Sequence, residues 1–251
     1  MALPIDMKGK AALVTGAASG LGRATAVKLA AAGADLCIVD VNGEALAETA
    51  AMLGDVQVMP LVADLADPDA CRDSVGQAVA RFGRLDALCN IAGVFKFAHF
   101  HEMPRADYER TIAINLSAPF FLSQAAIPHL LETNGAIVNC ASSAAFIGEA
   151  YATAYCASKA GLVQLTKAMA MEYARKPIRI NAVAPGGMMT NIGNGMQMPE
   201  GIEYDLVQRY SGLRGLVEVD DVADLVTLLA SPAGRSYHGA CISLDAGITA
   251  G

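Results

Sequence analysis

The sequence has no uninterrupted apolar run of the roughly 18 residues that a membrane-spanning helix requires, although hydrophobic residues make up 54% of its 251 positions. The first ten residues, MALPIDMKGK, contain no apolar stretch of the kind found in a secretory signal, and the segment that follows them is typical of a strand. We therefore expect a cytoplasmic protein that does not use the membrane as a partner.

Clustered positive charge is also missing. The formal net charge is −7, the pI is near 5.0, and no group of lysines and arginines stands out along the chain. Proteins that bind nucleic acid or an anionic membrane surface usually carry such a group. The composition therefore argues against a nucleic-acid partner and favours chemistry on a small molecule.

Metal-binding and disulfide patterns are absent as well. The six cysteines are far apart with no Cys-x-x-Cys spacing, so we expect free thiols that pack as small hydrophobic groups. His99 and His101 form one close pair without further candidate ligands nearby, so we expect a loop there and no metal site. Cys156 adjoins Tyr155, but neighbours on a helix point about 100° apart, which favours a structural role for the thiol.

Short β-rich segments alternate with longer helical ones through most of the chain, and the first helix is expected at about 20–32. With no linker or tandem repeat to divide the sequence, the pattern predicts a single domain over residues 1–251. Seven strands joined by crossover helices indicate an α/β, doubly wound Rossmann fold with a seven-stranded parallel sheet flanked by helices. The expected strands are 11–15, 35–39, 56–62, 85–90, 135–141, 178–184 and 241–245.

One segment, at about 186–215, breaks this alternation because glycine and methionine are concentrated in it. A loop of this length in a compact domain usually serves a function or lacks order. Because methionine is pliable and apolar, we expect a lid that closes over an apolar substrate. The alternative is a surface insertion whose methionines pack against the domain.

The stretch TGAASGLG, residues 15–22, follows the first expected strand and opens the first expected helix. Gly16 permits a tight turn, and Gly20 and Gly22 allow the backbone to approach a phosphate and the sheet. The N–H groups at the start of the helix carry a partial positive charge. The pattern therefore predicts a pyrophosphate site.

Asp40 ends the second expected strand, 18 residues after Gly22. A carboxylate there can accept hydrogen bonds from ribose hydroxyls and would repel a 2′-phosphate, and no arginine or lysine occupies 41–43. This favours NAD over NADP as the cofactor. The alternative role of Asp40, as the cap of a helix over 42–53, is compatible with the first.

The stretch YCASK, residues 155–159, lies in an expected helix and places a phenol and an ammonium group four residues apart, on one helix face. A free phenol has a pKa near 10, so acid–base chemistry at neutral pH requires that the phenolate be stabilised by about 4 kcal/mol. A nearby cation favours the phenolate. We therefore predict that Lys159 lowers the pKa of Tyr155 and makes it a proton carrier.

With these motifs in this order, the sequence resembles a short-chain dehydrogenase/reductase over essentially its whole length. NIAG at 90–93 is similar to the family's Asn-Asn-Ala-Gly, with Ile91 in place of the second asparagine, and PGGMMT at 185–190 is similar to its Pro-Gly turn. The Ile91 departure is expected to loosen hydrogen bonds that brace the sheet. The resemblance also implies a homotetramer, with interfaces at the helix of Tyr155 and the 221–230 helix.

The resemblance further assigns the site. Matching the family's Ser-x-x-Gly turn to SAAF favours Ser143 as the active serine, with Ser142 as the alternative. Phe146 then stands at the glycine position, and the stretch before the tyrosine is one residue shorter than is common in the family. The implied catalytic residues are Asn115, Ser143, Tyr155 and Lys159. The implied cofactor-binding residues are Gly16, Ser19, Gly20, Leu21, Gly22, Asp40, Asp64, Leu65, Asn90, Ala92, Gly93, Tyr155, Lys159, Pro185, Gly186, Met188 and Thr190.

The implied reaction is hydride transfer between NAD(H) and a secondary alcohol or ketone. Tyr155 would move the proton, Ser143 would hold the substrate oxygen, and Asn115 would hold a water that connects Lys159 to solvent. The expected substrate pocket is apolar, which favours a hydrophobic or cyclic substrate; its residues are Phe95, Ala145, Phe146, Tyr151 and Met189, together with Val94, Phe97 and Met188. The alternatives are an S-adenosylmethionine-dependent methyltransferase and a non-catalytic dinucleotide-sensing protein on the same scaffold.

Overall fold

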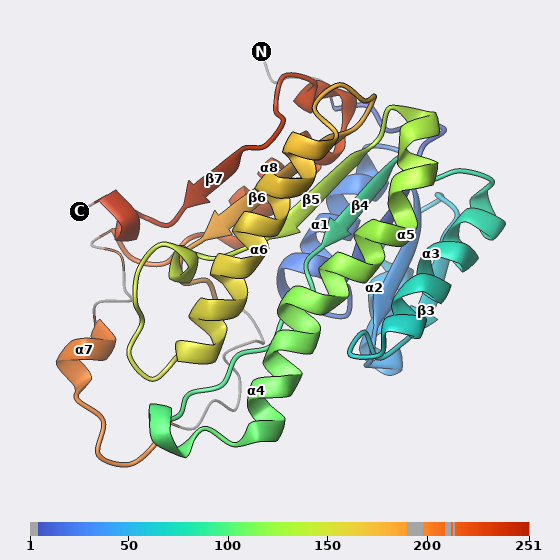
Figure 1. Ribbon diagram of the computed structural model, residues 1–251. Coiled ribbons are helices and arrows are strands. Elements are labelled where there is room, and N and C mark those ends of the chain that lie inside the picture. Colours follow the sequence, from blue (N-terminus) through green and yellow to red (C-terminus); the bar gives the residue numbers. More distant parts are fainter. Residues whose placement is uncertain (1–4, 190–197, 209–211, 213, 251) are drawn as a thin grey trace.

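The computed structural model describes residues 5–189, 198–208, 212 and 214–250. Within them, seven parallel strands form one sheet in the order β3-β2-β1-β4-β5-β6-β7, which confirms the predicted fold class (Figure 1). Each predicted strand matches an observed one to within two residues at either end. The strands are β1 Ala11–Thr15, β2 Asp35–Asp40, β3 Val58–Val62, β4 Ala87–Asn90, β5 Ala136–Cys140, β6 Arg179–Pro185 and β7 Cys241–Leu244.

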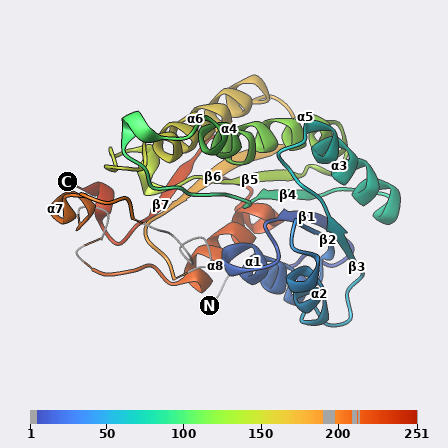
Figure 2. The same ribbon diagram turned by 90° about the horizontal axis from the view of Figure 1, so that it is seen from below.

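Helices cover both faces of this sheet. Figure 2 shows α1, α2 and α8 on one face and α3, α4, α5 and α6 on the other. Their bounds are α1 Gly20–Ala31, α2 Gly43–Ala51, α3 Pro68–Phe82, α4 Arg105–Ile112, α5 Ala118–Thr133, α6 Thr153–Glu172, α7 Tyr204–Gln208 and α8 Val219–Ala230, and a short π-helical segment, Ala113–Ser117, joins α4 to α5.

The central strands are apolar because both of their faces are covered. Every residue of β1, β4 and β5 is buried, as are the four inner residues of β2. Two large groups of buried side chains result, one between the sheet and the α1–α8 layer and one between the sheet and the α3–α5 layer. A strand buried on both faces shows a continuous apolar run, which is why the sequence predicts these strands so closely.

The order of the strands reverses between β1 and β4. The connection after β1 leads to one face of the sheet and the connection after β4 leads to the other, so a crevice opens between them at the carboxyl ends of the strands. In open α/β sheets, ligands bind at such a switch point. No helix in the part of the chain that the structure describes is long and apolar enough to cross a membrane.

Candidate active site

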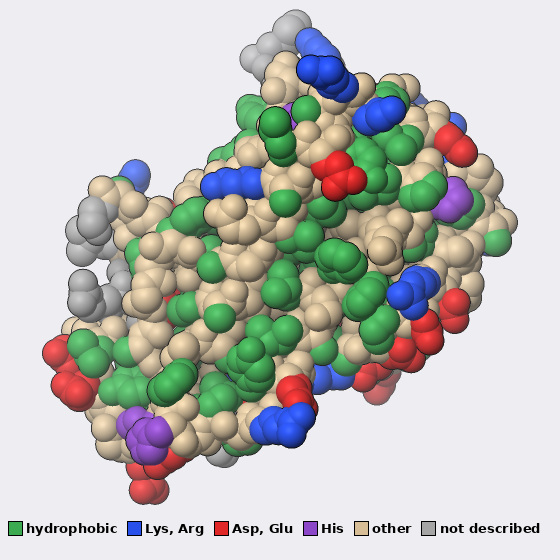
Figure 3. All heavy atoms as spheres, in the orientation of Figure 1, with side chains coloured by type: hydrophobic (Ala, Val, Ile, Leu, Met, Phe, Trp, Pro, Cys, Tyr) green, Lys and Arg blue, Asp and Glu red, His purple; other side chains and the backbone are tan. Residues whose placement is uncertain are grey.

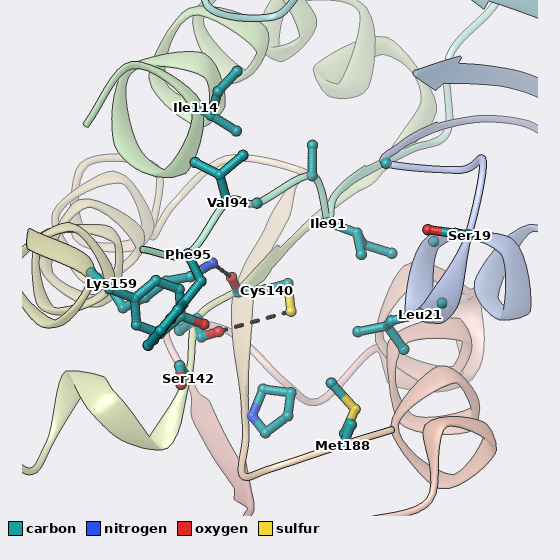
Figure 4. A pocket seen from close by; sticks show the side chains of 18 of the residues that line it. Ser19, Leu21, Ile91, Val94, Phe95, Ile114, Cys140, Ser142, Lys159 and Met188 are labelled. Atoms are coloured by element: carbon teal, nitrogen blue, oxygen red, sulfur yellow. Dashed lines mark hydrogen bonds between the residues drawn. The ribbon is translucent and has the colours of Figure 1, made fainter. Parts of the chain in front are cut away.

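A cavity of about 480 Å³ lies at this switch point (Figure 4). It is lined by residues from the ends of β1, β2, β3, β4, β5 and β6 and from α6. The predicted cofactor and catalytic residues that line it are Gly16, Ser19, Gly20, Leu21, Gly22, Asp40, Asp64, Leu65, Ala92, Gly93, Ser143, Tyr155, Lys159, Pro185, Gly186 and Met188. Positions far apart in the sequence therefore meet in one place.

The glycine turn between β1 and α1 leaves no space for side chains at two positions. A Cβ on Gly16, whose φ is +69°, would lie 2.8 Å from the Cα of Ala92, and one on Gly22 would lie 2.0 Å from the carbonyl oxygen of Gly16. Ser19 caps α1 without a side-chain hydrogen bond, and the first turn of this helix contains no acidic residue. The start of α1 therefore fits an anionic group such as a pyrophosphate.

Asp40 lies at the end of β2 beside the glycine turn. Its carboxylate accepts hydrogen bonds from the backbone N–H of Ala18 (3.1 Å) and of Asn42 (3.0 Å). The cap of α2 is Asn42, whose side chain accepts from Ala45 N, so the alternative role of Asp40 as the helix cap is wrong. The Asp40 carboxylate is thus fixed at the cavity wall by the backbone on either side of it.

Arg23 is the cation nearest to the glycine turn in sequence, but its guanidinium is engaged elsewhere. It donates to the carbonyl oxygens of Ala18 (2.5 Å) and Ala45 (3.1 Å), to Thr49 and to the carboxylate of Glu48. These contacts attach α1 to α2, and Arg23 does not line the cavity.

Asp64 follows β3 and lines the same cavity with Leu65. The guanidinium of Arg110, on α4, donates to both carboxylate oxygens at 2.8 and 2.7 Å, and these hydrogen bonds lower the pKa of Asp64. Arg110 was missed from the sequence because the pair spans 46 residues. No local spacing signals such a contact.

The turn after β4 is fixed to β1 by one side chain. The hydroxyl of Thr15 accepts hydrogen bonds from the backbone N–H of Ile91 (2.9 Å) and of Ala92 (3.0 Å). Ile91 itself lines the cavity, so its side chain faces the crevice (Figure 4).

Asn90 does not line the cavity, contrary to the prediction. Its amide points into the sheet and donates to Asn139 (2.8 Å), which in turn donates to the hydroxyl of Thr166 on α6 (2.8 Å). This buried chain of hydrogen bonds joins β4, β5 and α6. Bracing of the sheet therefore persists with isoleucine at position 91.

Asn115 is fully buried in the π-helical segment, and its side chain does not reach the cavity. The amide accepts from the backbone N–H of Val94 (2.9 Å) and donates to the carbonyl oxygen of Val94 (2.9 Å) and to the hydroxyl of Ser158 (3.1 Å). The side chain thus holds the segment after β4 against α6. A π-helical turn inside a helix is often found at a functional site.

Tyr155 and Lys159 lie on one face of α6, as the spacing predicts. The Lys159 Nζ is 5.6 Å from the centroid of the Tyr155 ring and donates to the carbonyl oxygen of Cys140 at 2.7 Å. The lysine is 3% exposed, and its side chain lines the cavity (Figure 4). Tyr155 and Lys159 therefore line the same cavity as the glycine turn.

The residues around Tyr155 do not lower its pKa, contrary to the prediction. Burial raises the pKa of Tyr155, and a side-chain hydrogen bond with Ser142 acts in the opposite direction to a smaller extent. Burial also lowers the pKa of Lys159, which disfavours its charged form. Desolvation is the largest cause of both shifts because both groups are buried.

The serine that contacts Tyr155 is Ser142, whereas the sequence favoured Ser143. Ser142 has an extended backbone (φ −169°) at the end of β5, and its hydroxyl accepts from Ala144 N at 3.2 Å. Ser143 begins the following 3-10 turn and is also buried against the cavity. Counting from Ser142 gives a spacing of 13 residues to the tyrosine, one more than from Ser143, and the choice between the two serines stays a prediction.

Of the predicted substrate residues, Phe95 lines the cavity, and its ring lies edge-on to that of Tyr155 with centroids 4.7 Å apart. Val94 and Met188 line it as well, whereas Phe97, Ala145, Phe146, Tyr151 and Met189 lie outside the lining. Phe146 and Met189 are 47% and 81% exposed, and Ala145 packs against a small group of buried residues between β6 and α6.

Tyr151, also predicted to contact substrate, is turned away by its backbone, which has a φ of +65°. Its hydroxyl accepts from the backbone N–H of Glu203 (3.0 Å), and its ring lies edge-on to that of His99. His99 Nε2 is 2.8 Å from the carbonyl oxygen of Glu200. These contacts join the 198–208 part of the expected lid to the loops beside the cavity; Thr190 lies outside the described residues.

Glu149 is a cavity residue that sequence reasoning missed. It is half-buried in the loop between β5 and α6, and burial raises the pKa of its carboxyl to about 7.

All six cysteines are unpaired, and burial raises the pKa of Cys37 and of Cys89 to about 12. The described residues contain no group of three or more His, Cys, Asp or Glu placed to hold a metal.

Comparison with known proteins identifies the family. A family model described as enoyl-(acyl carrier protein) reductase matches residues 16–249. The D-threitol dehydrogenase of Mycolicibacterium smegmatis is 37% identical over 246 residues, which cover 97% of this chain and 94% of that protein.

Two solved structures are similar over nearly the whole chain. Carveol dehydrogenase from Mycobacterium avium in complex with NAD has a TM-score of 0.88 and 28% identity, covering 98% of this chain and 100% of the other. A short-chain dehydrogenase from Burkholderia cenocepacia in complex with NADP has a TM-score of 0.84 and 34% identity, covering 96% and 98%. These matches give no support to a methyltransferase. The chain belongs to the short-chain dehydrogenase/reductase family of oxidoreductases.

Proposed function

We propose that this protein transfers a hydride between NAD(H) and a secondary alcohol or ketone. The observation that carries the proposal is the meeting of the Ser142–Tyr155–Lys159 group with the glycine turn in one cavity at the switch point of the sheet. The cradle around Gly16 and Gly22 fits a dinucleotide, and NAD, when bound, supplies the hydride acceptor or donor.

In the oxidation direction, Tyr155 removes the proton from the substrate hydroxyl, and in the reverse direction it returns a proton to the forming alkoxide. The Ser142 hydroxyl donates to the substrate oxygen and stabilises its developing charge. Ser142 takes the place of Ser143 in this role because its side chain is the one that contacts Tyr155.

Lys159 follows the tyrosine by four residues on α6. Its Nζ donates to the carbonyl oxygen of Cys140, and its side chain lines the cavity, where it would hold a ribose hydroxyl of the dinucleotide and favour the phenolate of Tyr155. The side chain of Asn115 is used to hold Val94, so its contribution is to position the segment after β4 and not to bind water through its amide.

The test of this proposal is turnover by Tyr155→Phe. The wild-type protein is expected to reduce NAD+ with a panel of secondary alcohols, followed by absorbance at 340 nm. We expect the variant to lose at least about a thousandfold in kcat while it still binds NAD, since it lacks only the proton carrier. Near-wild-type turnover would refute the proton-transfer role. Binding of NAD without turnover by the wild-type protein would favour the dinucleotide-sensing alternative.

We propose NAD over NADP because the Asp40 carboxylate is held at the cavity wall, where it repels a 2′-phosphate, and because Arg23 is engaged with α2. Asp40→Ser is expected to raise the NADP-to-NAD ratio of kcat/KM by at least about tenfold, since it removes a like charge. The matched control is Asp35→Ser, at the other end of the same strand. An unchanged ratio in Asp40→Ser would contradict the assignment.

We propose a hydrophobic or cyclic substrate because the apolar residues Phe95, Val94 and Met188 line the cavity and the ring of Phe95 contacts that of Tyr155. The carveol dehydrogenase named above acts, by its name, on a substrate of this kind. Turnover of cyclohexanol well above that of a free sugar of similar size would support this class.

We also propose a homotetramer. Figure 3 shows apolar side chains spread over the face of α4, α5 and α6, where Phe120 is 45% and Met171 79% exposed. The apolar residues of α8 are instead buried against α1 and the sheet. We therefore place the main interface on the α5–α6 face, and Phe120→Glu is expected to lower the mass measured by light scattering.

A further inference from the structure

Glu149 introduces a carboxyl group into the substrate end of the cavity. It lies in the loop between Ser142 and Tyr155 and lines the same cavity as both. Burial is the main cause of the raised pKa of the Tyr155 hydroxyl, and the charge of Glu149 contributes in the same direction. Of the other charged groups on the cavity wall, Lys159 lies on α6 with Tyr155, whereas Asp40, Asp64 and Arg110 belong to the opposite half around β2, β3 and α4.

The backbone and the side chain of Glu149 have separate surroundings. Its carbonyl oxygen accepts from the N–H of Ala152 at 3.2 Å, and hydrogen bonding of the Cys156 thiol to the Glu149 backbone lowers the pKa of that thiol. These contacts help α6 to begin, since Ala152 caps this helix without a side-chain hydrogen bond. Among the described residues, the carboxylate accepts no hydrogen bond and forms no ion pair. A structural explanation therefore accounts for the backbone of Glu149 and leaves its carboxylate unexplained.

An unpaired carboxyl that is partly removed from water costs free energy unless a donor reaches it. The titratable groups that face Glu149 come from α6 and are the hydroxyl of Tyr155 and the thiol of Cys156. The ammonium group of Lys159 donates to the carbonyl oxygen of Cys140. Neither facing group satisfies the carboxylate. Glu149 lines the cavity, and no donor for its carboxylate is found among the described residues, so the missing donor is expected to arrive with the substrate.

We propose that Glu149 is a specificity residue that accepts a hydrogen bond from a second hydroxyl group on the substrate. This hydroxyl is on the carbon adjacent to the reacting carbon, whose oxygen is bound by Tyr155 and Ser142. This inference rests on the proposed function and names its substrate class: a diol, or the matching hydroxy ketone, on an apolar skeleton. Substrates with a carboxylate at that position are rejected by like charge, and substrates with hydrogen there leave Glu149 unpaired.

The experiment compares two matched pairs of substrates, 1,2-cyclohexanediol with cyclohexanol and 2,3-butanediol with 2-butanol. In the wild-type protein we expect kcat/KM to favour the diol of each pair by between about tenfold and a hundredfold, the range for a hydrogen bond to a charged group. Glu149→Ala is expected to abolish this preference mainly through a higher KM for the diols; a change in kcat caused by the lost charge beside Tyr155 would be the same for both members of a pair and would cancel in their ratio. Glu149→Gln keeps an acceptor oxygen, so its preference for the diols is expected to lie between that of the wild type and that of Glu149→Ala.

The matched control is Glu172→Gln, which makes the same chemical change at an exposed position at the other end of α6. It is expected to leave the diol-to-alcohol ratio of kcat/KM unchanged for both substrate pairs. An unaltered diol preference in Glu149→Ala would overturn the inference. An equal loss of kcat for diols and simple alcohols, with that preference unaltered, would mean that Glu149 acts on Tyr155 and not on the substrate.

These outcomes are distinct from failure of the proposed function. If the wild-type protein oxidises the simple alcohols and Tyr155→Phe does not, the proposed reaction stands whatever the diol ratio shows. If the wild-type protein reduces NAD+ with none of the four alcohols, the substrate assignment to Glu149 is overturned together with the proposed reaction on these skeletons.

Discussion

The two halves of the cavity are built in different ways. The half around β1, β2 and α1 is shaped by the backbone, with glycines that leave no space for a Cβ and a carboxylate held by main-chain N–H groups. The half around α6 and the loop after β5 is shaped by side chains from separate parts of the chain, among them Ser142, Glu149 and Phe95. We infer that the first half tolerates almost no change in shape, whereas the second can be altered residue by residue.

The largest effect is expected in the first half, from Gly22→Ala. The added Cβ would meet the carbonyl oxygen of Gly16 at 2.0 Å, and both atoms belong to the fixed turn after β1. We expect loss of NAD binding, measured by fluorescence titration, together with a lower Tm. The control is Gly76→Ala in α3, where a Cβ meets nothing within 4 Å and alanine is the better helix former. If Gly22→Ala bound NAD as tightly as Gly76→Ala, the first half would not be rigid.

The same contrast explains what the sequence could predict. The strands, the glycine turn and Asp40 can be predicted from local patterns. Burial on both faces selects apolar residues along a strand, and a turn without space for a Cβ requires glycine. The 3.6-residue period also placed Tyr155 and Lys159 on one face. These predictions depend on neighbours in the chain, which the sequence contains directly.

Predictions in the second half failed where contacts come from distant segments. Tyr151 was assigned to the substrate, but its backbone has a positive φ and its hydroxyl is bonded to Glu203, 52 residues away. Asn90 was assigned to the cofactor, but a buried partner, Asn139, holds its amide inside the sheet. Such pairings depend on tertiary packing, and no periodicity in the sequence reports them.

A smaller effect separates the two serines of the second half. Ser142→Ala is expected to lower kcat/KM for a secondary alcohol by about a hundredfold, since it removes the donor beside the reacting oxygen. It is also expected to move the pH midpoint of kcat/KM to higher pH, because the Ser142 hydrogen bond lowers the pKa of Tyr155. Ser143→Ala, one residue away in the same buried turn, is the control. A larger loss and a larger pH shift in Ser143→Ala would restore the original assignment.

The smallest effect concerns Glu149 and stability. Burial raises the pKa of this carboxyl to about 7, above its ordinary value of 4.5, so the group ionises more readily in the unfolded chain than in the folded one. Its contribution therefore becomes unfavourable as the pH rises from about 4.5 to about 7 and stays unfavourable above that range. Glu149→Gln removes this cost, so we expect it to raise Tm at pH 8 and to change it little at pH 5. Glu172→Gln, at an exposed position, is expected to change Tm at neither pH. A gain of equal size at both pH values would mean that burial in the cavity does not raise the pKa of the Glu149 carboxyl. The second half would then impose no free-energy cost on the ionised carboxylate.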